Sequence, residues 1–101
     1  MHMTITKKQN GTALEIALEG RLDTVTAPQL EEALKTLPPE VNAVTFNFGE
    51  VDYISSAGLR VLLATQKRMK QAGGSMVITH VTPAVQEVFE ITGFLGILTI
   101  R

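Results

Sequence analysis

Two adjacent serines, Ser55 and Ser56, stand between an apolar run that ends at Ile54 and a second one that begins at Leu59, just after Gly58. A serine hydroxyl at such a junction can cap a helix, act as a nucleophile or accept a phosphate. A cap uses the free backbone N–H groups of the first helical turn, and the same groups and the helix dipole favour a phosphate. Capping and phosphorylation are therefore compatible interpretations of this pair.

The nucleophile interpretation has little support in the sequence. A serine nucleophile needs a base within hydrogen-bond reach and a third group that orients the base. His80 is the only credible base, and Ile54 stands where the nucleophile elbow G-x-S-x-G has its first glycine. A serine hydrolase would require His80 to lie near Ser56, so a structure that separates them would exclude it.

Asp23 is the second residue that invites a functional interpretation. It lies in the loop after the second predicted strand, where an aspartate commonly serves as a turn residue or a secondary cap. Loops at neighbouring strand ends of an α/β sheet share one edge, and ligands gather there. Asp23 and Ser56 are therefore candidates for one common surface.

Composition excludes several other classes of function. Two histidines and no cysteine leave little for a metal site, and the nucleotide-binding motifs G-x-x-x-x-G-K-[ST] and G-x-G-x-x-G are absent. The formal net charge of −1 gives no basic footprint for nucleic acid or an anionic membrane. The apolar runs are too short to span a bilayer. We expect one cytoplasmic domain over residues 1–101 that binds a protein or a small ligand.

The hydrophobic periodicity predicts the elements that position these residues. Alternation predicts strands over 3–8 and 12–20, joined by a tight turn at Asn10-Gly11. A capping box at Thr26–Gln29 predicts a helix that ends before Pro38. The remaining predicted elements are a strand over 43–48, a helix over 57–72, a strand over 76–79, a helix from Pro83 to Gly93 and a strand over 97–100.

The order is β-β-α-β-α-β-α-β, which predicts the α/β class. Strands that alternate with helices imply right-handed crossovers, so we expect a mixed, mostly parallel sheet of four to five strands with helices packed on it.

Three segments resemble the STAS domain family, in the short single-domain form known as the bacterial anti-sigma factor antagonist, or anti-anti-sigma factor. The first is Leu18-Glu19-Gly20-Arg21-Leu22-Asp23 with Thr26 and Ala27, the second is Asp52-Tyr53-Ile54-Ser55-Ser56-Ala57-Gly58-Leu59-Arg60-Val61-Leu62, and the third runs from Val81-Thr82-Pro83 through Phe89 to Thr92-Gly93-Phe94. Together they span nearly the whole chain.

The resemblance implies the STAS fold and a phosphorylation-switched binding protein with no catalytic residues. Unphosphorylated, such a protein binds an anti-sigma factor that is usually also a serine kinase, and thereby releases the sigma factor to regulate transcription. The phosphoacceptor position of the family falls on Ser56, and a serine phosphatase reverses the mark. ATP is used by the partner kinase, so no cofactor or metal is implied for this chain. The expected partner-binding residues are Asp23, Thr24, Ser55, Ser56, Ala57, Gly58 and Arg60.

One departure from the family pattern leaves an alternative open. Well-known members have an aspartate followed by two serines before the glycine, whereas this chain has Ser55, Ser56 and Ala57. Ser55 is therefore a rival phosphoacceptor. A different function within the same fold is a STAS subunit that docks on an ATPase of a transport or stress-signalling assembly. The oligomeric state is not fixed by the residues, and we expect a monomer.

Overall fold

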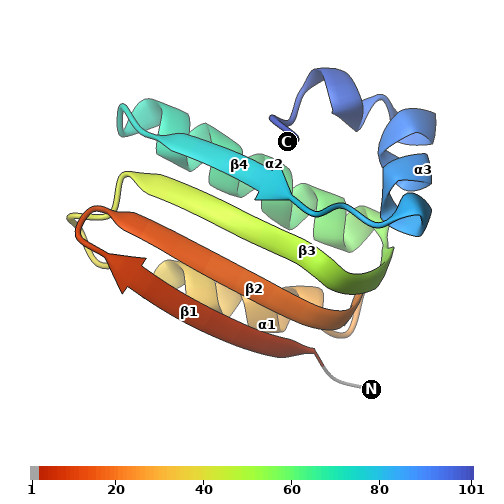
Figure 1. Cartoon of the computed structure of the whole chain (residues 1–101), viewed down its shortest axis with the longest axis horizontal. Coiled ribbons are helices and arrows are strands. Elements are labelled where there is room, and N and C mark those ends of the chain that lie inside the picture. Colours follow the sequence, from red (N-terminus) through yellow and green to blue (C-terminus); the bar gives the residue numbers. More distant parts are fainter. Residues whose placement is uncertain (1–2) are drawn as a thin grey trace.

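The computed structural model describes residues 3–101, which form a four-stranded sheet and three α-helices (Figure 1). The strands are β1 (Thr4–Asn10), β2 (Ala13–Leu22), β3 (Ala43–Ile54) and β4 (Ser75–Thr79). The helices are α1 (Ala27–Lys35), α2 (Ser56–Gln71) and α3 (Pro83–Thr92), followed by a short 3-10 turn, η1 (Phe94–Gly96).

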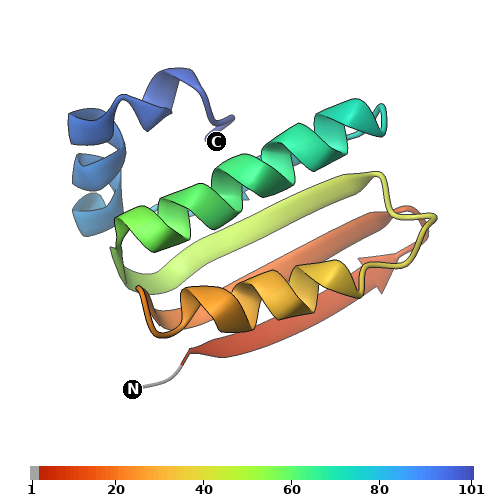
Figure 2. The ribbon, with the colours of Figure 1, turned by 180° about the vertical axis from the view of Figure 1, so that it is seen from behind.

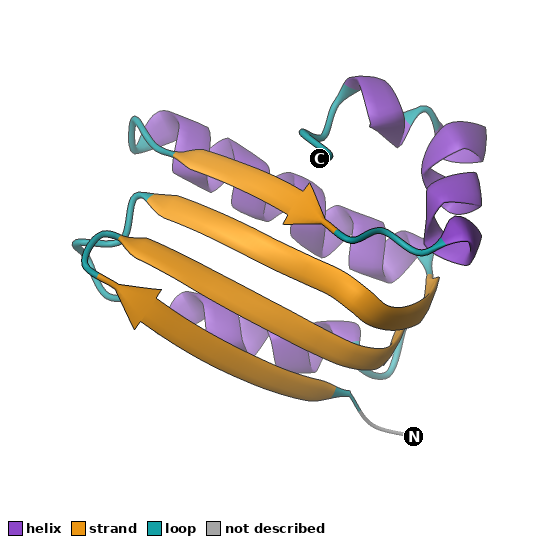
Figure 3. Cartoon of the chain, in the orientation of Figure 1, coloured by secondary structure: helices purple, strands orange, loops and turns teal. Residues whose placement is uncertain are grey.

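The sheet is mixed and mostly parallel, as the sequence predicts. Its strand order is β1-β2-β3-β4, in which β1 pairs antiparallel with β2 and the other pairs are parallel. Gly11 has a φ of 64° in the turn between β1 and β2, a conformation that glycine adopts without steric cost. The parallel strands β2, β3 and β4 therefore send their loops to α1, α2 and α3 from the same end of the sheet (Figure 3).

One face of the sheet carries the main core. Leu14, Ile16 and Leu18 of β2 are buried, whereas the alternate residues are exposed or half-buried, as the alternation predicts. Helices α1 and α2 cover this face side by side (Figure 2). Phe46 and Phe48 of β3 are fully buried, with their rings edge to face at 6.3 Å between centroids. Each such aromatic side chain brings a large apolar area into the core.

The predicted strand over 97–100 is wrong except at its end. Only Ile100 bridges to β4, opposite Ile78. The backbone N–H groups of Ile97 and Leu98 instead donate to the carbonyl of Phe94, at 3.0 and 2.9 Å. Because the local turn uses these two donors, they are not available to a strand ladder.

Two further predictions need correction. The third strand continues to Ile54, six residues beyond the predicted Phe48, so β3 carries the chain up to the serine pair. The capping box at Thr26 does not form: the Thr26 hydroxyl donates to the carbonyl of Arg21 at 2.6 Å and accepts from the N–H of Asp23 at 2.8 Å. Thr26 is buried and serves the preceding loop, while Pro28 lies in the first turn of α1 as predicted.

Candidate functional site

Ser55 caps helix α2. Its backbone is extended, with φ −103° and ψ 175°, and its side-chain oxygen accepts from the N–H of Gly58 at 3.5 Å. Its own N–H donates to the carbonyl of Leu22 at 2.9 Å, which ties the start of α2 to the end of β2. Ser55 is half-buried, and its carbonyl accepts from the N–H of Leu59 at 3.0 Å, so its hydroxyl, N–H and carbonyl groups all have partners.

Ser56 is the first residue of α2 and is exposed. Its hydroxyl makes no hydrogen bond to any residue between 3 and 101. The two serines therefore differ: one oxygen is used for the cap, and the other is free to meet a partner. The first turn of α2 holds no acidic residue, so the positive end of the helix dipole beside Ser56 is not neutralised from within the helix.

Gly58 lets α2 approach the strand ends closely. A Cβ atom at this position would lie 2.7 Å from Cγ of Leu22 and 3.0 Å from both the Leu22 carbonyl oxygen and a side-chain carbon of Ile54. Real Cβ atoms are almost never found at the first of these distances. Glycine is thus required here by a close approach to β2 and β3.

Asp23 organises the loop between β2 and α1. One carboxylate oxygen accepts from the backbone N–H groups of Val25 and Thr26, at 3.0 and 3.1 Å. The hydrogen bond from the Thr26 N–H is the main cause that lowers the pKa of the Asp23 carboxyl below its usual value, so the group is ionised at neutral pH. The interpretation of Asp23 as a turn residue is confirmed, and it is compatible with a place on the functional surface.

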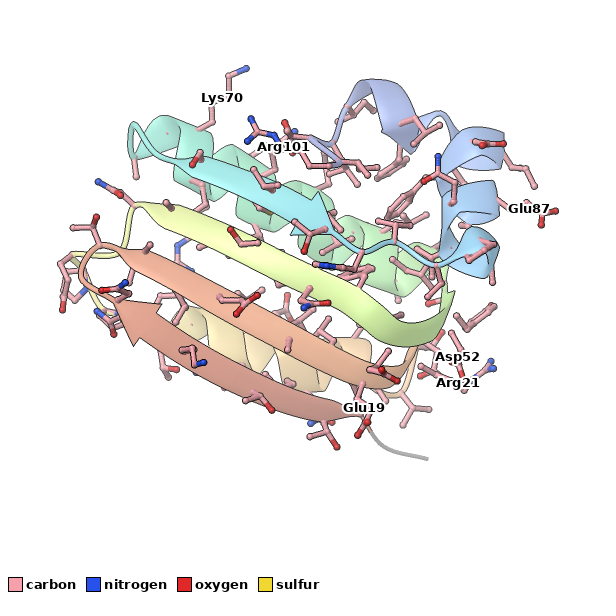
Figure 4. The ribbon with its side chains drawn as sticks, viewed as in Figure 1. Glu19, Arg21, Asp52, Lys70, Glu87 and Arg101 are labelled. Carbon is pink, nitrogen blue, oxygen red and sulfur yellow. The ribbon has the colours of Figure 1, made fainter. Side chains whose placement is uncertain are left out.

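Arg21 and Tyr53 form a pair that the sequence did not reveal. They are opposite each other in the register between β2 and β3, and the Arg21 guanidinium lies 4.2 Å from the centroid of the Tyr53 ring. Nε of Arg21 also lies 3.5 Å from a carboxylate oxygen of Asp23. Figure 4 shows Arg21 and Asp52 at the same end of the sheet. Local sequence patterns do not predict that two residues more than thirty positions apart are paired across neighbouring strands.

Thr24, Ala57 and Arg60 lie together although they come from two different segments. All three line a surface hollow of about 420 Å³ between the N-terminal halves of α1 and α2. The other lining residues are Ala27, Pro28, Glu31, Val61 and Ala64. The structure thus brings the expected partner-binding residues to one end of the sheet, in two neighbouring loops and the start of one helix.

His80 stands apart from the serines. Thr79, the last residue of β4, pairs with Asn47 of β3, and the Cβ of His80 lies 3.5 Å from the place of a Cβ on Gly49. From Gly49 to Ile54 the strand runs a further roughly 16 Å before it reaches the serines. The imidazole Nδ1 is 3.0 Å from the Thr79 hydroxyl. This placement removes the geometric basis for a serine–histidine pair.

Two other kinds of site have no counterpart in the part of the chain that is described. Residues 3–101 hold no group of three or more histidine or acidic side chains that would suit a metal ion. None of their helices combines the length and the apolar character that crossing a membrane requires.

The family model of the STAS domain matches residues 4–101. The chain belongs to the STAS domain family. This STAS protein is 38% identical over 99 residues to BtrV of Bordetella bronchiseptica, which is named as a candidate anti-sigma factor antagonist; the match covers 97% of this chain and 85% of BtrV. It is 30% identical over 100 residues to the anti-sigma-B factor antagonist of Bacillus subtilis, and this match covers 99% of this chain and 92% of that protein.

A solved structure agrees with the fold. The crystal structure of an anti-sigma factor antagonist from Mycobacterium paratuberculosis superimposes with a TM-score of 0.86 at 22% identity, covering 98% of this chain and 85% of the other. The predicted STAS fold and family are therefore confirmed. The roles of the individual site residues stay predictions.

The different roles of the two serines lead to a first testable prediction. Ser55→Ala removes the cap of α2 and should lower the free energy of unfolding by about 0.5–1 kcal/mol, at the low end for a cap because the bond is long. Urea unfolding would measure the shift. Ser56→Ala is the matched control and should leave the midpoint unchanged, since its hydroxyl bonds nothing within residues 3–101; equal effects would contradict this assignment.

Proposed function

We propose that this STAS protein is an anti-sigma factor antagonist, switched by phosphorylation of Ser56. The observation that carries the proposal is the exposed, unbonded hydroxyl of Ser56 at the first position of α2, on a chain whose relatives are named anti-sigma factor antagonists. In the unphosphorylated form the protein binds an anti-sigma factor with serine kinase activity, and the sigma factor is released. These names favour this role over docking on a transport or stress-signalling ATPase.

The geometry favours Ser56 over Ser55 as the phosphoacceptor. A kinase must reach the hydroxyl and place it in line with the γ-phosphate of ATP. Ser56 is exposed, whereas Ser55 is half-buried and its oxygen accepts from the N–H of Gly58. Phosphorylation of Ser55 would therefore disturb the cap, while phosphorylation of Ser56 leaves every hydrogen bond of the described residues in place.

A phosphate on Ser56 changes the charge of the surface without unfolding the helix. It adds about −1.5 to −2 charges at neutral pH, and the N-terminus of a helix tolerates negative charge. Asp23, on the neighbouring loop, is already ionised. A partner surface that fits the neutral hydroxyl then meets concentrated negative charge and dissociates, and a serine phosphatase restores the binding form. ATP is bound by the kinase, so the antagonist itself needs no cofactor.

Phosphopeptide mapping tests the proposal directly. The purified protein is incubated with the anti-sigma kinase encoded in the same genome and with ATP, and the phosphate is located by mass spectrometry. We expect one phosphate on Ser56, which is retained in Ser55→Ala and absent from Ser56→Ala. A phosphate on Ser55 in the unaltered chain would transfer the switch to the capping residue.

A further inference from the structure

The hollow beside Ser56 is one end of a longer groove between α1 and α2. A second hollow of about 210 Å³ continues it and shares Glu31, Val61 and Ala64 with the first. The groove runs on α2 from Ala57 to Arg68, a rise of roughly 16 Å or three helical turns. In Figure 2 both helices lie over the same face of the sheet and run in the same general direction.

Small side chains make the floor of this groove. Ala57, Val61 and Ala64 of α2 stand at positions i, i+4 and i+7, and Ala27 faces them from the start of α1. Alanines at these places leave space where larger side chains would close the contact between two helices. The floor is apolar, and the spacing is that of one helix face.

At the first hollow, the two rims of the groove carry opposite charges. Glu31 of α1 and Arg60 of α2 both line the first hollow, and neither takes part in an ion pair within the described residues 3–101. Further along, Arg68 is held in place because its guanidinium donates to the Leu34 carbonyl at 2.7 Å. At the first hollow an apolar floor therefore lies between one acidic and one basic rim, whereas Lys35 of α1 makes both rims basic at the far end of the second hollow. The first hollow matches a partner helix that carries an apolar stripe with acidic side chains on one side of it and a basic side chain on the other.

We propose that this groove receives an amphipathic helix of the anti-sigma factor, with acidic side chains toward Arg60 and a basic side chain toward Glu31. This inference rests on the proposed function, because the groove begins at Thr24 and Ala57, which flank the switch. A helix that lies along two others packs its ridge into the groove between them. The interface thus extends from the phosphorylation site along three turns of α2.

The placement of Arg60 connects the groove with the switch. Arg60 follows Ser56 by four residues on α2, so the two side chains are neighbours on the helix surface. A phosphate on Ser56 stands beside the guanidinium that the carboxylates of the partner helix would use. The phosphate therefore repels the acidic side chains of the partner helix. It also competes with those side chains for the Arg60 guanidinium.

Filling the groove tests the inference. Ala64 is exposed, so Ala64→Trp should fold normally while its indole occupies the floor. With the purified anti-sigma kinase of the same genome as the probe, calorimetry should show binding about tenfold weaker or worse, as expected for a blocked central contact. Ala72→Trp adds the same side chain to an exposed position outside both hollows and should bind like the unaltered protein.

A second pair of variants tests the charges and does not depend on how the tryptophan packs. Arg60→Glu and Glu31→Arg should each weaken binding by about fivefold or more, since each sets like charges against each other. If Ala64→Trp and both charge variants bind as tightly as the unaltered protein, the groove is not the binding site of a partner helix. That result would leave the proposed switch at Ser56 intact. No binding by the unaltered protein would instead overturn the proposed function. A dimer that Ala64→Trp dissociates would assign the groove to a second copy of the chain and overturn the inference.

Discussion

Ser56→Asp is expected to weaken binding to the anti-sigma factor by about a hundredfold, which corresponds to roughly 2.7 kcal/mol. The substitution places a permanent negative charge where the partner meets a neutral hydroxyl. Because Ser56 is the first residue of α2, an aspartate there interacts favourably with the helix dipole and should not lower stability. Calorimetric titration, together with a thermal unfolding curve of each variant, would separate lost binding from lost folding.

Two control variants make this result specific. Ser56→Ala should bind as tightly as the unaltered protein and should not be phosphorylated. Ser55→Asp places the same charge one residue earlier, at a cap position where aspartate is a preferred residue. It should keep most of the affinity. If Ser55→Asp weakened binding as strongly as Ser56→Asp, the negative charge at the helix end would matter and the identity of Ser56 would not.

The order of the helices and strands was predictable because glycines stand at several of their ends. Gly11, with its φ of 64°, turns β1 into β2, and Gly93, with its φ of 80°, ends α3. Alternation along β2 predicted correctly which face is buried. Two of the errors have a common cause: Thr26 and Ile97 each have local partners, the loop carbonyl of Arg21 and the carbonyl of Phe94, that compete with the predicted structure. Sequence periodicity does not show such competition.

The residues of the candidate site could be predicted from the sequence, but the different roles of Ser55 and Ser56 could not. The sequence left Ser55 and Ser56 as rivals because either one can precede a helix. What separates them is a backbone angle: Ser55 is extended and points its oxygen at the N–H of Gly58, whereas Ser56 is already helical. The stack of Arg21 on Tyr53 was missed because it depends on the register of two strands separated by a helix. Long-range register is set by packing, which local patterns do not encode.

Gly58→Ala is expected to destabilise the protein, although alanine is the better helix former. Helix propensity alone favours alanine over glycine by about 1 kcal/mol. Against this, the new Cβ would lie 2.7 Å from Cγ of Leu22 and 3.0 Å from the backbone oxygen of the same residue. Leu22 is fully buried at the end of β2, so it has little space to move. Overpacking of this kind costs about 1–3 kcal/mol, so after the gain in helix propensity we expect a net loss of stability of up to about 2 kcal/mol.

Urea unfolding at constant slope would measure this loss, and Gly96→Ala is the matched control. A Cβ on Gly96 meets no atom within 4 Å, so that variant should unfold within about 0.5 kcal/mol of the unaltered protein. The Cβ of the alanine variant lies only two residues after Ser56. To relieve its contact with Leu22, the first turn of α2 must shift away from β2. Gly58→Ala should therefore also weaken binding to the anti-sigma factor, even where the protein is fully folded. A stabilised Gly58→Ala variant would show that α2 is free to move outward, and that the close approach at Gly58 does not fix the position of the switch.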